Sequence, residues 1–119
     1  MEKKYFLNFN DAETIDIPAP PMKRQIFFGD HMLVGKNVIL AHTLVPAHSH
    51  PEEQISVVVK GECDVITYLE GETLRQHCVP GGIAWFPSGV KHELLCTSDE
   101  DCEVWDWFSP VREDWIPKD

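Results

Sequence analysis

Turn-forming residues interrupt this sequence at short intervals, and this spacing limits the fold more than any other feature. Between them lie short runs rich in Val, Ile, Phe and Trp, and no run keeps a helical apolar period over about ten residues. Runs that recur about every 8–12 residues are typical of an all-β barrel or sandwich. The expected strands are Gln25–Phe28, Met32–Val34, Val38–Val45, Gln54–Lys60, Cys63–Leu69, Thr73–Cys78, Ile83–Phe86, Glu93–Thr97 and Glu103–Phe108. A short helical turn is expected only near residues 112–115.

The size and composition of the chain allow one domain with its own core. Its 119 residues lie in the common size range of domains, and 43% of them are hydrophobic. Near the N-terminus, Ile17–Met22 holds three prolines in four residues, which excludes a helix or a central strand. We therefore expect an extended N-terminal arm over residues 1–22 and one barrel domain over residues 23–119.

The charge balance of the chain is strongly acidic. Ten Lys and Arg against twenty Asp and Glu give a formal net charge of −10. A surface of this charge repels phosphate backbones and anionic lipids, so we expect neither a nucleic-acid nor a membrane partner. An anionic substrate would need a local cationic site within this acidic surface.

The N-terminus and the cysteines bear on the compartment. No apolar stretch follows the charged start MEKKYFLNFNDAE, so no signal peptide is expected. The four cysteines (Cys63, Cys78, Cys96 and Cys102) form no Cys-x-x-Cys pair, and we interpret them as reduced, buried, small hydrophobic residues. Together these features predict a cytoplasmic protein.

Three histidines and a glutamine are candidate metal ligands. His48 and His50 are two residues apart, which on an extended chain places both imidazoles on one face, about 6–7 Å apart. Gln54 follows at the start of the next expected strand, and His92 lies much later. Three neutral nitrogens and one amide oxygen suit a divalent transition metal such as Zn, Ni, Fe or Mn. A His-x-His pair is weak by itself, because a single histidine on a β face is more often structural.

The longer pattern is more specific. His48-x-His50-x3-Gln54-x6-Gly61 is followed by Gly81-x5-Pro87-x-Gly89-x2-His92. This resembles the two sequence motifs of the cupin superfamily, although the leading glycine of the first motif is absent and Gln54 replaces its frequent glutamate. The resemblance implies a small single-domain jelly-roll barrel. It also implies a divalent metal in the mouth of the barrel, held by His48, His50, Gln54 and His92, and a homodimer.

Three segments give a narrower resemblance. HSHPEEQ, FPSGVKHE and the ending Val104–Trp115 occur in the order typical of the KdgF family of pectin-degradation proteins. That resemblance implies ring opening of a 4,5-unsaturated monouronate, an anionic sugar, to a linear keto sugar acid. It assigns Asp106, Phe108 and Arg112 to the active site. Glu52 stands where many relatives carry a third histidine, and we do not expect it to be a ligand.

The alternation of side chains in the last expected strand bears on Asp106. Val104, Asp106 and Phe108 share one face, and Trp105 and Trp107 share the other. We expect the first face to be inside because two of its members are apolar; the alternative is that Asp106 points to solvent. An acid in apolar surroundings has a raised pKa and can move protons. The two tryptophans indicate that the second face is also covered, by another sheet or another chain.

Two arginines are candidates for binding a substrate carboxylate. Arg112 follows a proline in a loop, where its guanidinium could grip a carboxylate or simply pair with Glu113 or Asp114. Arg24 lies on the first strand after the expected arm, either as surface charge or as a second substrate-binding group at the mouth of the barrel.

Three functions remain open from the sequence. The first is a metal-dependent enzyme acting on unsaturated uronates. The second is a metal-dependent dioxygenase or lyase that uses the same four ligands on another small molecule. The third is a non-catalytic module that binds sugar acids.

Overall fold

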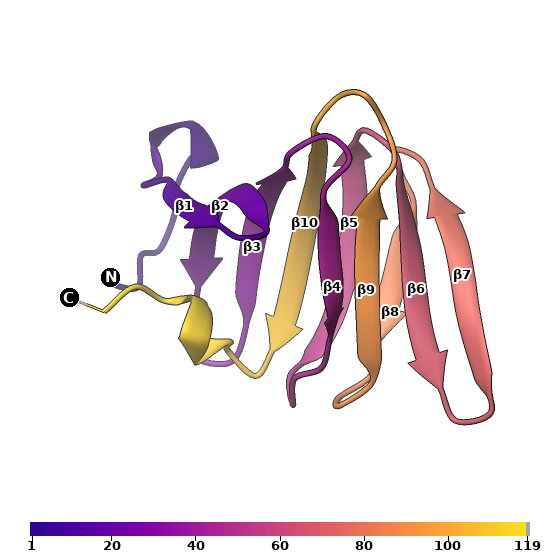
Figure 1. Cartoon of the computed structure of the whole chain (residues 1–119). Helices are drawn as coiled ribbons and strands as arrows, with labels where there is room; N and C mark the ends of the chain where they lie inside the picture. The colour runs from indigo at the N-terminus through magenta and orange to yellow at the C-terminus, as the bar shows by residue number, and fades with distance from the viewer. Residues whose placement is uncertain (119) are drawn as a thin grey trace.

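Two antiparallel β-sheets face each other in the computed structural model, which describes residues 1–118 (Figure 1). One sheet has the strand order β1-β2-β3-β10-β5-β8, and the other has the order β4-β9-β6-β7. The elements are η1 (Phe9–Asp11), β1 (Ile15–Pro18), β2 (Pro21–Phe28), β3 (Leu33–Ile39), β4 (Leu44–His48), β5 (Glu53–Lys60), β6 (Cys63–Leu69), β7 (Glu72–Cys78), β8 (Ile83–Phe86), β9 (Lys91–Cys96), β10 (Cys102–Ser109) and η2 (Glu113–Trp115). Neither short helix within residues 1–118 approaches the length needed to cross a bilayer. The fold is a jelly-roll barrel, which confirms the all-β prediction.

The strand register brings the candidate residues to one end of the barrel. β10 lies between β3 and β5, and Asp106 on β10 is opposite Gly35 on one side and Ser56 on the other. In the second sheet, His48 at the end of β4 pairs with His92 near the start of β9. This end of the barrel is at the bottom of Figure 1, where β4 ends and β9 begins.

The core between the sheets is apolar and includes all four cysteines. Cys63, Cys96 and Cys102 are completely buried and, like Cys78, are free thiols. Burial raises the pKa of Cys63 to about 12, so this thiol stays protonated and packs as a small hydrophobic residue. A second, smaller apolar cluster forms around Leu33 and Phe108, beside His50 and against Trp115.

The observed β3 differs from the expected strands. A turn was expected at residues 35–37 because of Gly35, but β3 runs without interruption through it. Gly35 serves close packing instead, since a Cβ atom at this position would lie 2.6 Å from a ring carbon of Trp115. The turn between β3 and β4 comes later, where the Thr43 amide donates to the Leu40 carbonyl.

The N-terminal segment also differs from the expected extended arm. β1 pairs with β2 along its length, with Ile17 opposite Met22 and Pro18 opposite Pro21. The boundary drawn between residues 22 and 23 therefore falls inside β2. The prolines are accommodated because Pro18 ends the edge strand β1 and Pro21 is the first residue of β2, where a missing N–H disrupts little of the ladder.

Candidate metal centre

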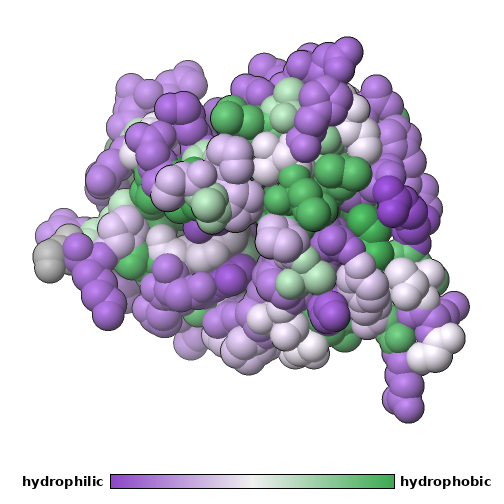
Figure 2. Space-filling view, in the orientation of Figure 1, coloured by the Kyte–Doolittle hydropathy of each residue, from purple (hydrophilic) through white to green (hydrophobic). Residues whose placement is uncertain are grey.

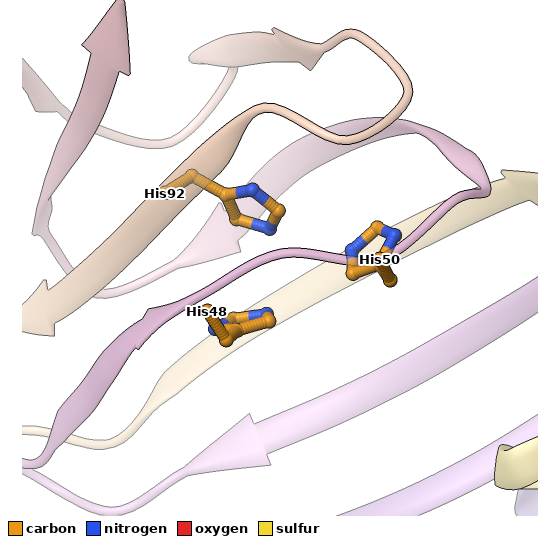
Figure 3. Close-up of side chains that lie close together, drawn as sticks. All are labelled: His48, His50 and His92. Carbon is orange, nitrogen blue, oxygen red and sulfur yellow. The ribbon is translucent and has the colours of Figure 1, made fainter.

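Three imidazoles gather at the open end of the barrel (Figure 3). His48 ends β4, His50 lies in the loop that follows, and His92 comes from β9. One ring nitrogen from each histidine lies within 4.8 Å of the corresponding atoms of the other two. The three side chains thus converge on one point next to the pair formed by His48 and His92.

Backbone carbonyls fix the tautomer of each histidine. The Nδ1 atoms of His48, His50 and His92 lie 2.9, 2.9 and 2.8 Å from carbonyl oxygens two residues away in the chain, those of Pro46, Glu52 and Val90. A carbonyl can only accept, so each Nδ1 carries a proton and each Nε2 of a neutral ring presents a lone pair. Burial lowers the pKa of His92 to about 4 and also lowers that of His50, which favours neutral rings.

Two features of these Nε2 atoms indicate a site for a cation. His92 Nε2 is buried and has no hydrogen-bond partner among residues 1–118. His50 Nε2 lies 2.9 Å from Gln54 Oε1. The Gln54 amide nitrogen donates to Ser56 Oγ at 2.8 Å and to Asp106 Oδ1 at 3.1 Å, so its oxygen must be the atom that faces the histidines. Two acceptors in contact repel each other, whereas two ligands of one metal, each about 2.1 Å from it, normally lie about 3 Å apart.

The residues therefore fit a divalent transition metal. Three neutral imidazole nitrogens and one amide oxygen would hold it, and the hydrogen bond from each Nδ1 is the kind of support that metal-bound histidines normally have. This donor set suits Zn, Ni, Fe or Mn alike. Glu52 lies beside His50 Nδ1 at 3.6 Å, on the side of the ring away from this convergence.

Asp106 faces the barrel interior, next to the candidate ligands. Its Oδ1 accepts hydrogen bonds from Ser56 Oγ at 2.5 Å and from Gln54, and its Oδ2 accepts one from Asn37 Nδ2 at 2.6 Å. Burial raises the pKa of Asp106, although these three donors and the nearby Arg24 oppose that effect. Asp106 is thus a buried acid that is tied to the candidate metal centre through Gln54.

Two guanidinium groups face the same space. Arg24 stacks on Trp115, with Cζ 3.4 Å from the ring centroid, and its Nε donates to Asn37 Oδ1 at 2.8 Å. Burial lowers the pKa of Arg24 to about 10, which leaves it charged at neutral pH. Arg112 pairs with Asp114 at 3.2 Å through Nε and lies 5.0 Å from the Trp115 ring. Arg112 therefore pairs with an acid, which is one of its two sequence interpretations, and it also lines the cavity.

A cavity of about 320 Å³ joins these groups. Its polar lining consists of His48, His92, Gln54, Asp106, Arg24, Arg112, Asn37, Ser56 and Glu93. Phe108 does not line it: this side chain is 1% exposed and packs edge-on against His50 and Trp115. A pocket with two guanidinium groups and imidazoles, in a protein of net charge −10, suits a small anion.

Sequence reasoning missed Asn37 and Ser56. Asn37 was assigned to a turn, but it lies on β3, where it bridges Arg24 and Asp106. Ser56 is two residues after Gln54 and so shares its face of β5. That spacing was the available signal for Ser56, whereas no local pattern distinguished Asn37.

Two facing antiparallel sheets with this donor set define a small jelly-roll protein with a candidate metal site. The chain belongs to the cupin family, because the family's sequence model of the cupin domain matches residues 38–108. No curated protein matched the chain.

Solved structures agree with this family. An RmlC-like cupin from Shewanella frigidimarina is 26% identical, with a TM-score of 0.85 over 96% of this chain and 97% of the other. KdgF from Halomonas sp. is 25% identical, with a TM-score of 0.80 over 97% of this chain and 100% of the other. An oxalate decarboxylase variant from Bacillus subtilis is 14% identical, with a TM-score of 0.79 over 94% of this chain and 31% of the other, and shares the fold.

Proposed function

We propose that this protein is a metal-dependent enzyme that opens the ring of 4,5-unsaturated monouronates to give linear keto sugar acids. One observation carries the proposal: a single cavity is lined by two of the three clustered histidines, the glutamine, a buried acid and two guanidinium groups. The likeness to KdgF over the full length of both chains supports it. We place the activity in the cytoplasm, with which the four free thiols agree.

The substrate carboxylate is the group that the two arginines would bind. Arg24 is held in place by Trp115 and Asn37, so its fork loses little freedom on binding an anion. Arg112, which pairs with Asp114 through Nε, lines the same cavity. The anionic sugar would thereby be oriented against the histidine cluster.

Asp106 would move the proton. A bound metal supplies Lewis acidity toward substrate oxygens and a fixed point for binding. Asp106 takes the proton of the anomeric hydroxyl as the bond from C1 to the ring oxygen breaks, which leaves an aldehyde and an enolate. It returns this proton to C4, and the enolate becomes a ketone. Burial raises the pKa of Asp106, and a raised pKa suits a carboxyl group that both takes and returns a proton.

Proton NMR of unsaturated galacturonate with the metal-loaded protein tests the proposal. We expect accelerated loss of the ring-form signals with the wild-type protein and none with Asp106→Ala, whose metal content should remain near wild type. Asp99→Ala, at an exposed carboxylate, is the matched control and should keep full activity. No acceleration by the metal-loaded wild type would contradict the proposal, and oxygen consumption in its place would favour the dioxygenase class.

A further inference from the structure

Trp115 lies between two parts of the chain that line the cavity. It is the last residue of η2, the short helix after β10 at the lower left of Figure 1, where Figure 2 shows a mostly hydrophilic surface. Its ring packs edge-on against Phe108, with the centroids 4.7 Å apart, and lies so close to Gly35 that a Cβ atom there would be 2.6 Å away. Two buried residues thus fix the indole, which still lines the cavity.

Both arginines of the cavity face this one ring. Arg24, on β2, places its Cζ atom 3.4 Å from the ring centroid, and Arg112, in the loop after β10, places its Cζ atom 5.0 Å from it. A guanidinium within about 6 Å of an aromatic centroid is attracted by the ring, and indole attracts cations most strongly. Each arginine has a further partner of its own, Asn37 for Arg24 and Asp114 for Arg112. The indole is thus the group that connects the two guanidinium groups.

The two guanidinium groups are near enough to repel each other. Burial lowers the pKa of Arg24 to about 10, and the charge of Arg112 adds to this effect while those of Asp106 and Asp114 oppose it. Arg24 makes no ion pair with any carboxylate in the described part of the chain; its hydrogen bonds go to an amide oxygen and a thioether sulfur. Two cations held near each other cost free energy, and an anion bound between them removes that cost.

Taking the anionic substrate of the proposed function, on which this inference rests, we propose that Trp115 is a positioning residue that holds Arg24 and Arg112 together as one carboxylate site. Arg24 already covers one face of the ring at 3.4 Å, which leaves no room on that face for a sugar. Trp115 therefore acts through the arginines and sets the affinity for the carboxylate. The proton transfer at Asp106 does not involve the indole, so its loss raises KM and leaves kcat nearly unchanged.

An NMR titration of the metal-loaded protein with galacturonate, which has no 4,5 double bond and does not react, tests this inference. Trp115→Leu removes the aromatic face that attracts both guanidinium groups, and we expect the Kd of galacturonate to rise about 10-fold. Trp115→Phe keeps an aromatic face and should stay within about 3-fold of wild type. Trp85→Leu is the matched control, because Trp85 is 61% exposed and does not line the cavity, and it should leave the Kd unchanged.

Two further measurements separate positioning from a purely structural role. In a protein that carries Arg24→Met, Trp115→Leu should raise the Kd of galacturonate by less than about 3-fold, because the ring has already lost one of its two arginines. With unsaturated galacturonate as substrate, Trp115→Leu should raise KM about 10-fold and lower kcat less than about 3-fold. Calorimetric titration of the same variant with Ni should give the wild-type affinity, since Trp115 contacts none of the candidate ligands.

Four results would overturn the inference. They are a wild type that does not bind galacturonate, an unchanged Kd in Trp115→Leu, an equal rise in Kd with and without the Arg24 side chain, and a parallel loss of Ni affinity. The third result would mean that the indole contacts the sugar directly, and the fourth that it only supports the fold. A wild type that binds galacturonate in this Trp115-dependent way but does not open the unsaturated ring would refute the proposed function alone.

Discussion

Asn37 is the residue whose replacement tests the buried polar network most sharply. It is 2% exposed and accepts from Arg24 Nε at 2.8 Å while donating to Asp106 Oδ2 at 2.6 Å. Asn37→Leu keeps a similar volume but leaves the partly buried Arg24 guanidinium and the buried Asp106 carboxyl each without one partner. Hydrogen bonds to charged groups contribute about 1.5–3 kcal/mol each.

The expected loss of stability follows from these two contacts. Burial of the leucine side chain returns about 1–2 kcal/mol, so we expect Asn37→Leu to lower the free energy of unfolding by roughly 2–4 kcal/mol. Urea unfolding of the metal-free protein measures this difference. Asn8→Leu is the control, because Asn8 is exposed and makes no capping hydrogen bond, and we expect a change within about 0.5 kcal/mol. If Asn37→Leu were as stable as Asn8→Leu, the network would not contribute as argued.

Three further predictions concern other parts of the chain. His92→Ala should weaken Zn or Ni binding by at least about 100-fold in calorimetric titration, and unchanged affinity would remove this residue from the ligand set. Hydrogen bonds to Glu62 and Asp64 raise the pKa of His77 above 6.5, so the stability that these contacts add is fully present below pH 6.5 and is lost as the pH rises through the raised pKa. An NMR titration that gives His77 a pKa below 6.5 would refute this. Gly35→Ala should destabilise the protein by about 1–3 kcal/mol, because the new Cβ meets the packed indole at 2.6 Å, and a thermal midpoint equal to wild type would count against that contact.

Short-range sequence patterns predicted a strand correctly where the turn residues and the run of apolar residues indicate the same bounds. Cys63–Leu69 and Ile83–Phe86 were predicted at the bounds they have in the structure, because a glycine or proline follows each apolar run. Gly35 misled the strand prediction, since its role is set by Trp115, a residue 80 positions away that no local rule connects to it. The proline-rich turn misled it in the same way, because whether a strand lies at a sheet edge is decided by the whole topology.

The candidate site likewise contains residues that local spacing predicts and residues that only the topology of the sheets brings together. The spacing of His48, His50 and Gln54 is local, and the three side chains lie together in the structure. His92 joins them through the β4–β9 pairing, and its assignment from the sequence rested on the resemblance to the cupins. The role of Asn37 depends on three strands meeting in one sheet, which periodicity alone does not reveal.

Anomalous X-ray scattering from crystals of the metal-loaded protein tests the central claim most directly. We expect one strong peak about 2.0–2.2 Å from the Nε2 atoms of His48, His50 and His92 and from Gln54 Oε1. A peak elsewhere, or four side chains that stay apart at saturating metal, would contradict the account.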